Sequence, residues 1–309
     1  QADSLTIVLV QGPAALDVAL ISFIHEFAEE KNKYERRQIT YRIHGSLDGL
    51  DEEATSTVIE KNIQLHAWFD GSESLHNAQQ SALRAPSWET TLQRLLVAHK
   101  TIEKAQKPKD GQRITAEVHV GKTATGQAET IVQGLQQAKI ERFRITPILE
   151  GEHAISPEAY GTFIDDLLSS LETLEKDSPA LIEEQIEALS GWIQSGEVSD
   201  PLTSTRPATG YNARSYNIAG DIYPSCSALL LAEDGDATFL LGNVATDSME
   251  DIAGHATLRT LIVASATDCL PGYQHLWSTP YISPDPIAAY KTTGNIFTTT
   301  TTSVFHLAT

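Results

Sequence analysis

The sequence predicts an α/β fold built around a parallel β-sheet, and two observations support this prediction. Five short apolar runs rich in β-branched residues occur before residue 150, and such runs are typical of buried parallel strands. Segments with helical periodicity separate these runs, and strands that alternate with helices form right-handed βαβ units. The pattern fits either a partial (β/α) barrel or an open doubly wound sheet.

The elements before residue 175 follow one another in a regular order. Strands are predicted from the β-branched runs, and helices from apolar residues at spacings of three and four. Ser87 is the predicted N-cap of its helix, and Asp70–Gly71 is a turn signal after the third strand. The predicted strands are 5–10, 39–44, 63–69, 114–120 and 143–148, and the predicted helices are 18–33, one opened by residues 51–53, 87–98, 129–138 and 157–174.

The pattern changes after residue 175. Ser178–Pro179 interrupts the chain before a predicted helix over 180–193. Prolines, glycine and Thr/Ser residues make 201–211 loop-like. The remaining predicted features are short strands in 215–222 and 238–241 and a threonine-rich tail, 292–302, read as an irregular loop or an edge strand. We therefore expect two domains, 1–175 and 176–309.

Composition excludes several classes of function. The net charge of −19 opposes binding to nucleic acid or to an anionic membrane surface. No apolar run approaches the ~20 residues of a membrane span. Two widely separated cysteines form no disulfide framework, which favours a cytoplasmic protein. Because the chain opens with Gln1, we expect a fragment, a processed product or an incompletely read sequence.

Several motifs in the first half resemble the radical S-adenosylmethionine (SAM) core. Asp70-Gly71 with His76-Asn77 resembles the "LDGP…HN" signature that follows the fourth strand of that family. Ser87-Trp88-Glu89 resembles the start of the next helix. The resemblance implies a partial (β/α) barrel of the radical SAM type that lacks its first strand.

The second half resembles the SPASM-type extension, which holds auxiliary iron–sulfur clusters. Tyr216-Asn217 with 220–224 is similar to its "YN.DGDIYP" motif, and Cys269–Gly272 resembles its final cysteine-rich block. Together the motifs look most like the His-Xaa-Ser system maturases, which modify ribosomal peptides. The family would bring SAM and [4Fe–4S] clusters as cofactors, and a ribosomal peptide substrate or a maturase partner.

The positions that would bind SAM depart from the family pattern. The "GGEP" that holds the SAM amino group falls on Gln11, Gly12 and Pro13, so its carboxylate is absent. The family asparagine after the third strand falls near Ser46. A small residue expected beside SAM falls on Trp68, whose indole would occupy cofactor space if it points inward.

The positions that would hold auxiliary clusters depart from the pattern as well. Cys269 keeps a thiolate, but the chain has only two cysteines, whereas a cluster needs about four. Leucine and isoleucine cannot ligate iron, while histidine can. The corresponding positions are Ser225, Cys269, Tyr273, Leu276, Ile282 and His306. As written, the sequence predicts no cofactor.

Several histidine, aspartate and cysteine residues are candidates for metal binding, base catalysis or nucleophilic catalysis. His44, His66 and His119 could bind a metal if they converged, although ordinary hydrogen-bonded histidines are favoured. Asp70 could act as a general base, but a structural turn residue is favoured, and His76–Asn77 is read as a capping and turn element. Cys226 has no motif that supplies a base, so an inert thiol is favoured.

Three hypotheses follow. The preferred one is a degenerate radical SAM/SPASM relative that binds a substrate peptide or serves as an inactive partner of a maturase. The second is an active maturase whose cluster ligands are missing from this sequence. The third is a structural or assembly protein that reuses the scaffold, because fold does not fix function.

Overall fold

A computed structural model describes residues 4–11, 15–83, 86–104, 114–149, 151–174, 180–196, 210, 213–266, 270 and 284–298. The chain divides into two compact units, Gln1–Glu187 and Ala188–Thr309. Each unit is described by itself. The division falls within helix α7 (Glu184–Ser195), twelve residues after the boundary expected from the sequence at 175.

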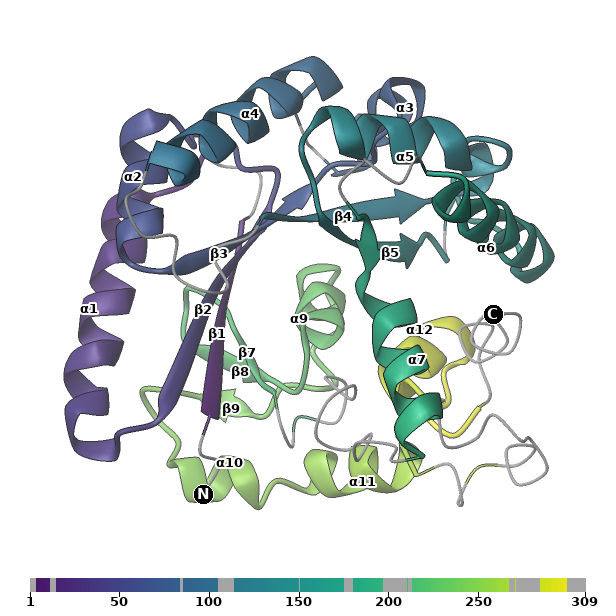
Figure 1. The fold of residues 1–309 in the computed structure, drawn as a ribbon. Helices are drawn as coiled ribbons and strands as arrows, with labels where there is room; N and C mark the ends of the chain where they lie inside the picture. Colours follow the sequence, from purple (N-terminus) through teal and green to yellow (C-terminus); the bar gives the residue numbers. More distant parts are fainter. Residues whose placement is uncertain are drawn as a thin grey trace. The chain divides into compact units, whose positions relative to one another are not determined.

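A six-stranded parallel sheet forms the first unit (Figure 1). Its strands pair in the order in which they occur in the chain, without a reversal. A doubly wound sheet reverses its strand order, so the observed order is that of a singly wound sheet, as in a (β/α) barrel. The strands are β1 (Ser4–Val10), β2 (Gln38–Gly45), β3 (Ile63–Trp68), β4 (Ile114–Val120), β5 (Arg142–Pro147) and β6 (Ile182–Glu183).

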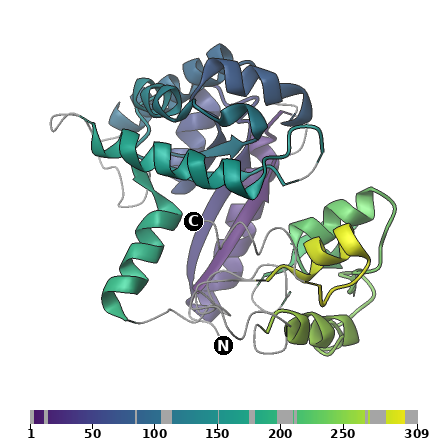
Figure 2. The ribbon, with the colours of Figure 1, turned by 90° about the vertical axis from the view of Figure 1, so that its right-hand side faces the viewer.

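The helices of this unit lie on one side of the sheet, because right-handed crossovers between sequential strands all place them there. In Figure 1 they follow one another around the outside of the strands, and Figure 2 shows the same layer from the side. The helices are α1 (Val18–Glu35), α2 (Glu52–Glu60), α3 (Glu73–Leu83), α4 (Trp88–Lys104), the 3₁₀ turn η1 (Lys122–Ala124), α5 (Ala128–Gln137) and α6 (Pro157–Glu172).

Side-chain caps explain where several helices begin. Asp51 accepts a hydrogen bond from the Ala54 amide, and Ser156 accepts one from the Ala159 amide. Ser87 Oγ accepts a bond of 3.3 Å from the Thr90 amide, which confirms the predicted cap of α4. Each cap satisfies a backbone donor that has no partner within its helix.

Two elements differ from the sequence-based expectation. His76 and Asn77 lie inside α3 and not in a turn, although Asn77 Oδ1 caps the start of α4 by accepting a bond of 3.0 Å from the Trp88 amide. Within residues 73–79 of α3, Leu75, His76 and Gln79 are buried, and two of these three are polar, so hydrophobic periodicity gave little signal for this helix. The stretch 180–193, expected to be helical throughout, begins with β6 and continues as α7.

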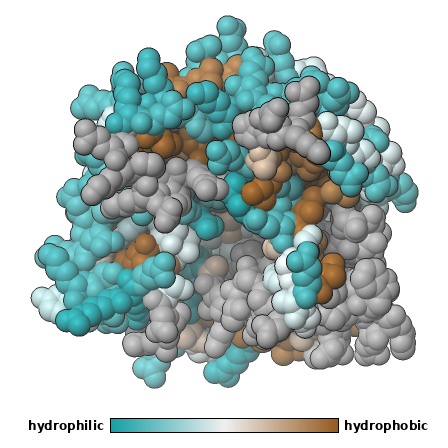
Figure 3. Space-filling view, in the orientation of Figure 1, coloured by the Kyte–Doolittle hydropathy of each residue, from teal (hydrophilic) through white to brown (hydrophobic). Residues whose placement is uncertain are grey.

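The core of the first unit lies between the sheet and its helices. Strand residues contribute alternate side chains, as in Ile43, Leu65 and Val118, and helix residues such as Leu95 and Leu135 pack from outside; each of these is at most 2% exposed. On the face drawn in Figure 3, hydrophilic residues cover most of the described helices and hydrophobic ones show in smaller patches.

The second unit contains a small antiparallel sheet, β7 (Ser215–Tyr216), β8 (Asp221–Tyr223) and β9 (Gly242–Asn243). The short strands expected in 215–222 are confirmed as β7 and β8, which pair as a hairpin, whereas 238–241 leads into β9 instead of forming a strand. The described helices of this unit are α9 (Cys226–Glu233), α10 (Met249–Ala253), α11 (Ala256–Ala264) and α12 (Pro286–Thr293). Helix α12 includes residues 292 and 293, the first two of the threonine-rich tail expected over 292–302. Residues 299–302 lie outside the described residues.

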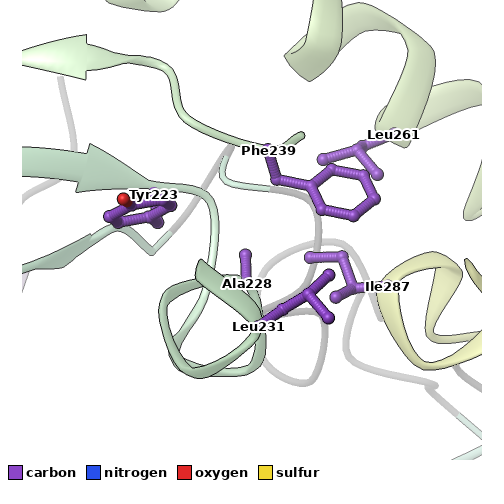
Figure 4. Packing of buried hydrophobic residues seen from close by; sticks show 6 residues of the cluster. All are labelled: Tyr223, Ala228, Leu231, Phe239, Leu261 and Ile287. Atoms are coloured by element: carbon purple, nitrogen blue, oxygen red, sulfur yellow. The ribbon is translucent and has the colours of Figure 1, made fainter. Parts of the chain in front are cut away.

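A hydrophobic cluster holds the second unit together. Phe239 and Leu261 approach Leu231 and Ile287, which come from α9 and α12 (Figure 4). The ring of Tyr290 packs edge-on against Phe239, with 5.1 Å between ring centroids. Within the described parts of the chain, no helix is both long and apolar enough to cross a membrane.

Candidate functional site

Polar side chains line the face of the sheet that points away from the helices. Strand residues alternate between faces, and because Ile43, Leu65 and Val118 are buried against helices, their neighbours lie on the other side. We call this side the inner face. The residues on it include Arg42, His44, Gln64, His66, Trp68, Glu117, His119, Arg142, Arg144 and Thr146.

Two histidines stack at the centre of the inner face. His44 and His66 are register partners on β2 and β3, and their rings lie 4.4 Å apart at an angle of 17°. Burial, His44 and the two arginines Arg42 and Arg144 lower the pKa of His66 to about 3. Burial also lowers the pKa of His44. Both rings are therefore neutral near pH 7.

A buried carboxylate joins two strands and a helix at the carboxyl end of β3. Asp70 is fully buried, and its Oδ2 lies 3.0 Å from His76 Nδ1 on α3. The backbone amide of His119 donates a bond of 2.7 Å to Asp70 Oδ1. His76 Nε2 in turn lies 3.0 Å from the Pro86 carbonyl oxygen. Burial alone would raise the pKa of Asp70, but the side chains of His119 and His76 outweigh it and lower that pKa.

His119 connects this carboxylate to the inner face. Its Nδ1 lies 3.4 Å from Asp70 Oδ1, outside good hydrogen-bond alignment. Its ring meets the Trp68 indole edge-on, with 6.1 Å between centroids. Burial lowers the pKa of His119, but Asp70 and Glu117 raise it more, so the net shift is upward. The imidazole of His119, with its raised pKa, therefore lies against the indole of Trp68.

The expected cofactor-binding positions come together only in part. Gln11 follows β1 and donates from Nε2 to the Asp48 carbonyl at 3.1 Å. Ser46 is buried, and its Oγ accepts a bond of 3.4 Å from the Asp48 amide. A Cβ on Gly45 would lie 2.4 Å from Gln11 Cβ, so glycine permits this approach. Gly12 and Pro13 lie outside the described residues.

Trp68 lies on the inner face, so its indole points inward, as the sequence-based argument about cofactor space requires. It ends β3, where register pairs it with Glu117 on β4. Its contact with His119 turns the indole toward the carboxyl end of β4. The indole therefore takes up room at the end of the sheet where α/β barrels carry their chemistry.

The expected cluster positions lie in the second unit. Ser225 is the N-cap of α9 and accepts a bond of 3.2 Å from the Ala228 amide. Burial and Glu233 raise the pKa of the adjacent Cys226 thiol, which disfavours the reactive thiolate. The other positions, Cys269, Tyr273, Leu276, Ile282 and His306, lie outside the described residues.

The three histidines considered as metal ligands do not form one set. His44 faces His66, whereas His119 faces Asp70 and Trp68. Across the residues that the structure describes, no three His, Cys, Asp or Glu side chains are grouped to hold a metal ion.

Comparison with solved structures identifies the fold. Native anSMEcpe with bound AdoMet matches with a TM-score of 0.61 at 14% identity, over 82% of this chain and 68% of that chain. The fold is of the radical SAM type. The complexes of the same protein with AdoMet and the Kp18Cys or Cp18Cys peptide match over 82% of this chain and 68% or 69% of theirs, at 14% identity and TM-scores of 0.57 and 0.58.

The radical SAM-like core expected from the sequence is thereby confirmed as a fold. No protein-family model and no curated protein matches the chain. At 14% identity the likeness concerns the fold alone. The His-Xaa-Ser type, the SPASM-like nature of the second unit and the loss of cofactor sites stay predictions.

The inner face as a unit was not predicted. Arg42 with His44, Gln64 with His66, and Glu117 with His119 each occupy alternate positions in their strands, between residues that are buried and apolar. Strands buried on both faces read as continuous apolar runs, so polar residues at every second position were the signal. The Asp70 network had no such signal, because it depends on a helix that was not predicted.

Proposed function

We propose that this chain is a degenerate relative of the radical SAM/SPASM peptide maturases, which binds a peptide on the inner face without performing radical chemistry. The observation that carries the proposal is the place of Trp68. Its indole lies on the inner face beside His119, at a position where the resembled family has a small residue next to SAM.

The donor chemistry of the described residues does not fit AdoMet. The side chain of Gln11 and the hydroxyl of Ser46 are engaged with the backbone of Asp48. The sequence Gln11-Gly12-Pro13-Ala14 has no carboxylate at the position where the family motif has one. Iron–sulfur clusters need about four thiolates, and the sequence contains two cysteines.

Support for a peptide as the ligand comes from the solved structures that share the fold. Two of them contain a peptide together with AdoMet. In this chain the inner face offers donors, acceptors and an indole on β2 to β5, and such mixed surfaces suit an extended chain with polar side chains. A peptide-binding protein or a maturase partner is therefore the function that the geometry supports best.

Anaerobic purification followed by iron and sulfide analysis and AdoMet calorimetry tests the proposal. We expect no stoichiometric cluster and no AdoMet binding by the natural chain. A Trp68→Gly variant distinguishes steric exclusion from missing donors: binding gained by this variant alone identifies the indole as the obstacle. Stoichiometric [4Fe–4S] or tight AdoMet binding by the natural chain contradicts the proposal and favours an active maturase.

A further inference from the structure

The inner face carries positive charge in a strongly acidic protein. The chain has 41 acidic and 22 basic residues, and three other described arginines of the first unit, Arg37, Arg94 and Arg142, are paired with carboxylates. Arg94 binds Asp48 at 2.7 Å, and Arg142 binds both Glu184 and Glu187. On the inner face, the described residues place no carboxylate within ion-pair distance of Arg42 or Arg144.

Among the described residues, each of these arginines has a neutral amide as its hydrogen-bond partner. Arg42 Nε donates to Gln64 Oε1 at 2.9 Å. With the Gln185 amide turned to present its oxygen, Arg144 lies 3.3 Å from that oxygen. An arginine bound to an amide keeps its full charge and several N–H donors for another acceptor. Arg144 is exposed and Arg42 is half-buried.

The carboxylate on the same face does not neutralise them. Glu117 is the register partner of Arg144, yet its Oε1 accepts a bond of 3.0 Å from Thr146 Oγ1. Arg42, Arg144 and Glu117 together therefore carry two positive charges and one negative charge, before any histidine is protonated.

The stacked rings of His44 and His66 lie close enough to Arg42 and Arg144 to feel the charge of both arginines. Burial is the main cause that lowers the pKa values of His44 and His66, and Arg42 and Arg144 both add to it, while Glu117 and Glu184 act in the opposite direction at His44. Among the described residues, His44 Nε2 is also buried without a hydrogen-bond partner. A buried polar atom without a partner is costly, so an occupant that supplies one is favoured here.

We infer that the inner face binds an acidic peptide, with Arg42 and Arg144 as the residues that recognise its carboxylate side chains. The inference rests on the proposed peptide binding and adds the class of peptide. Guanidinium groups bind carboxylates through charge-assisted, often bidentate hydrogen bonds. Gln64 and Gln185 orient the two arginines without consuming their charge.

Fluorescence anisotropy with two labelled peptides tests this inference. One peptide alternates Glu and Ala, and the other has Gln in place of every Glu. We expect the natural chain to prefer the Glu peptide by about tenfold or more, and this preference to weaken as salt rises. The double variant Arg42→Gln with Arg144→Gln should lose the preference, and Arg144→Glu alone should reduce it or favour a Lys peptide.

A matched control removes the same number of charges elsewhere. Lys104→Gln with Lys139→Gln deletes two exposed cations that pair with Glu52 and Glu103, and it should leave the preference unchanged. Equal affinity for both peptides, or a preference that survives loss of both arginines, overturns the inference and leaves peptide binding intact. Binding of neither peptide overturns the proposed function as well.

Discussion

Asp70 and His76 form a hydrogen bond of 3.0 Å between two side chains that are both fully buried. The bond joins the end of β3 to the first turns of α3, and the His119 amide attaches β4 to the same carboxylate. A single carboxylate thus fixes three neighbouring elements at the carboxyl end of the sheet.

Replacing Asp70 by asparagine should destabilise the fold strongly. The variant leaves His76 and the His119 amide without their charged acceptor, and breaking a buried pair costs about 3 kcal/mol or more. Urea unfolding measures this change. Asp48→Asn is the matched control, because its pair with Arg94 is partly exposed and should be worth less than about 1 kcal/mol. Equal effects of the two substitutions would refute the structural role of Asp70.

The stability of the first unit should fall as the pH is lowered from neutral, because of His66. Its folded pKa of about 3 lies below the unfolded value of about 6.5. The unfolded state therefore binds the proton first, and native stability is lost as the pH falls from about 6.5 towards 3. At pH 5 the loss from this group is about 2 kcal/mol relative to pH 7. Chemical unfolding at both values measures it, and His66→Gln should show a smaller difference.

Trp68 fluorescence should report the titration of His119. A protonated imidazole quenches a neighbouring indole, and the two rings are in edge contact. Asp70 and Glu117 raise the pKa of His119. The emission of Trp68, obtained by subtracting the spectrum of the Trp68→Phe variant, should therefore increase as the pH is raised. The midpoint of this increase should lie above the ordinary pKa of histidine. Asp70→Asn should move that midpoint down. A midpoint that ignores this substitution would show that Asp70 does not set the basicity of His119.

Two glycines in helices should respond to alanine in opposite directions. A Cβ on Gly134 in α5 would lie 2.0 Å from the Gly71 carbonyl oxygen, so Gly134→Ala should cost about 2 kcal/mol through forced displacement of backbone. Gly191 in α7 has nothing within 4 Å, and Gly191→Ala should stabilise by up to about 1 kcal/mol through helix propensity. Thermal unfolding of the two variants measures the contrast, and a stabilising Gly134→Ala would disprove the close approach.

The strands of the first unit could be predicted closely from sequence. Apolar β-branched runs fixed β2 and β4 to within about a residue, because burial on the helix side demands such side chains. The strand order could not be predicted from composition and periodicity, which do not distinguish singly from doubly wound sheets, and only the resemblance to the radical SAM core implied a barrel-type order. Helix α3 was missed because its buried face carries His76 and Gln79 in place of apolar residues.

The candidate site could be predicted only as single positions. Trp68 and Ser46 were identified from motif resemblance, and their surroundings were not. The contact of Trp68 with His119 depends on the register between β3 and β4, which no local pattern encodes. Arg42 and Arg144 lie about one hundred residues apart in the sequence, so their shared face becomes evident only when the strands are aligned.

The sequential strand order also bears on how the first unit is made. Each of the strands β2 to β6 pairs with the strand that precedes it in the chain, so no strand has to wait for a distant partner to leave the ribosome. Folding rates fall as contacting residues lie farther apart along the chain, and domains form progressively during synthesis. The sheet can therefore be assembled one strand and one helix at a time, in the direction of translation.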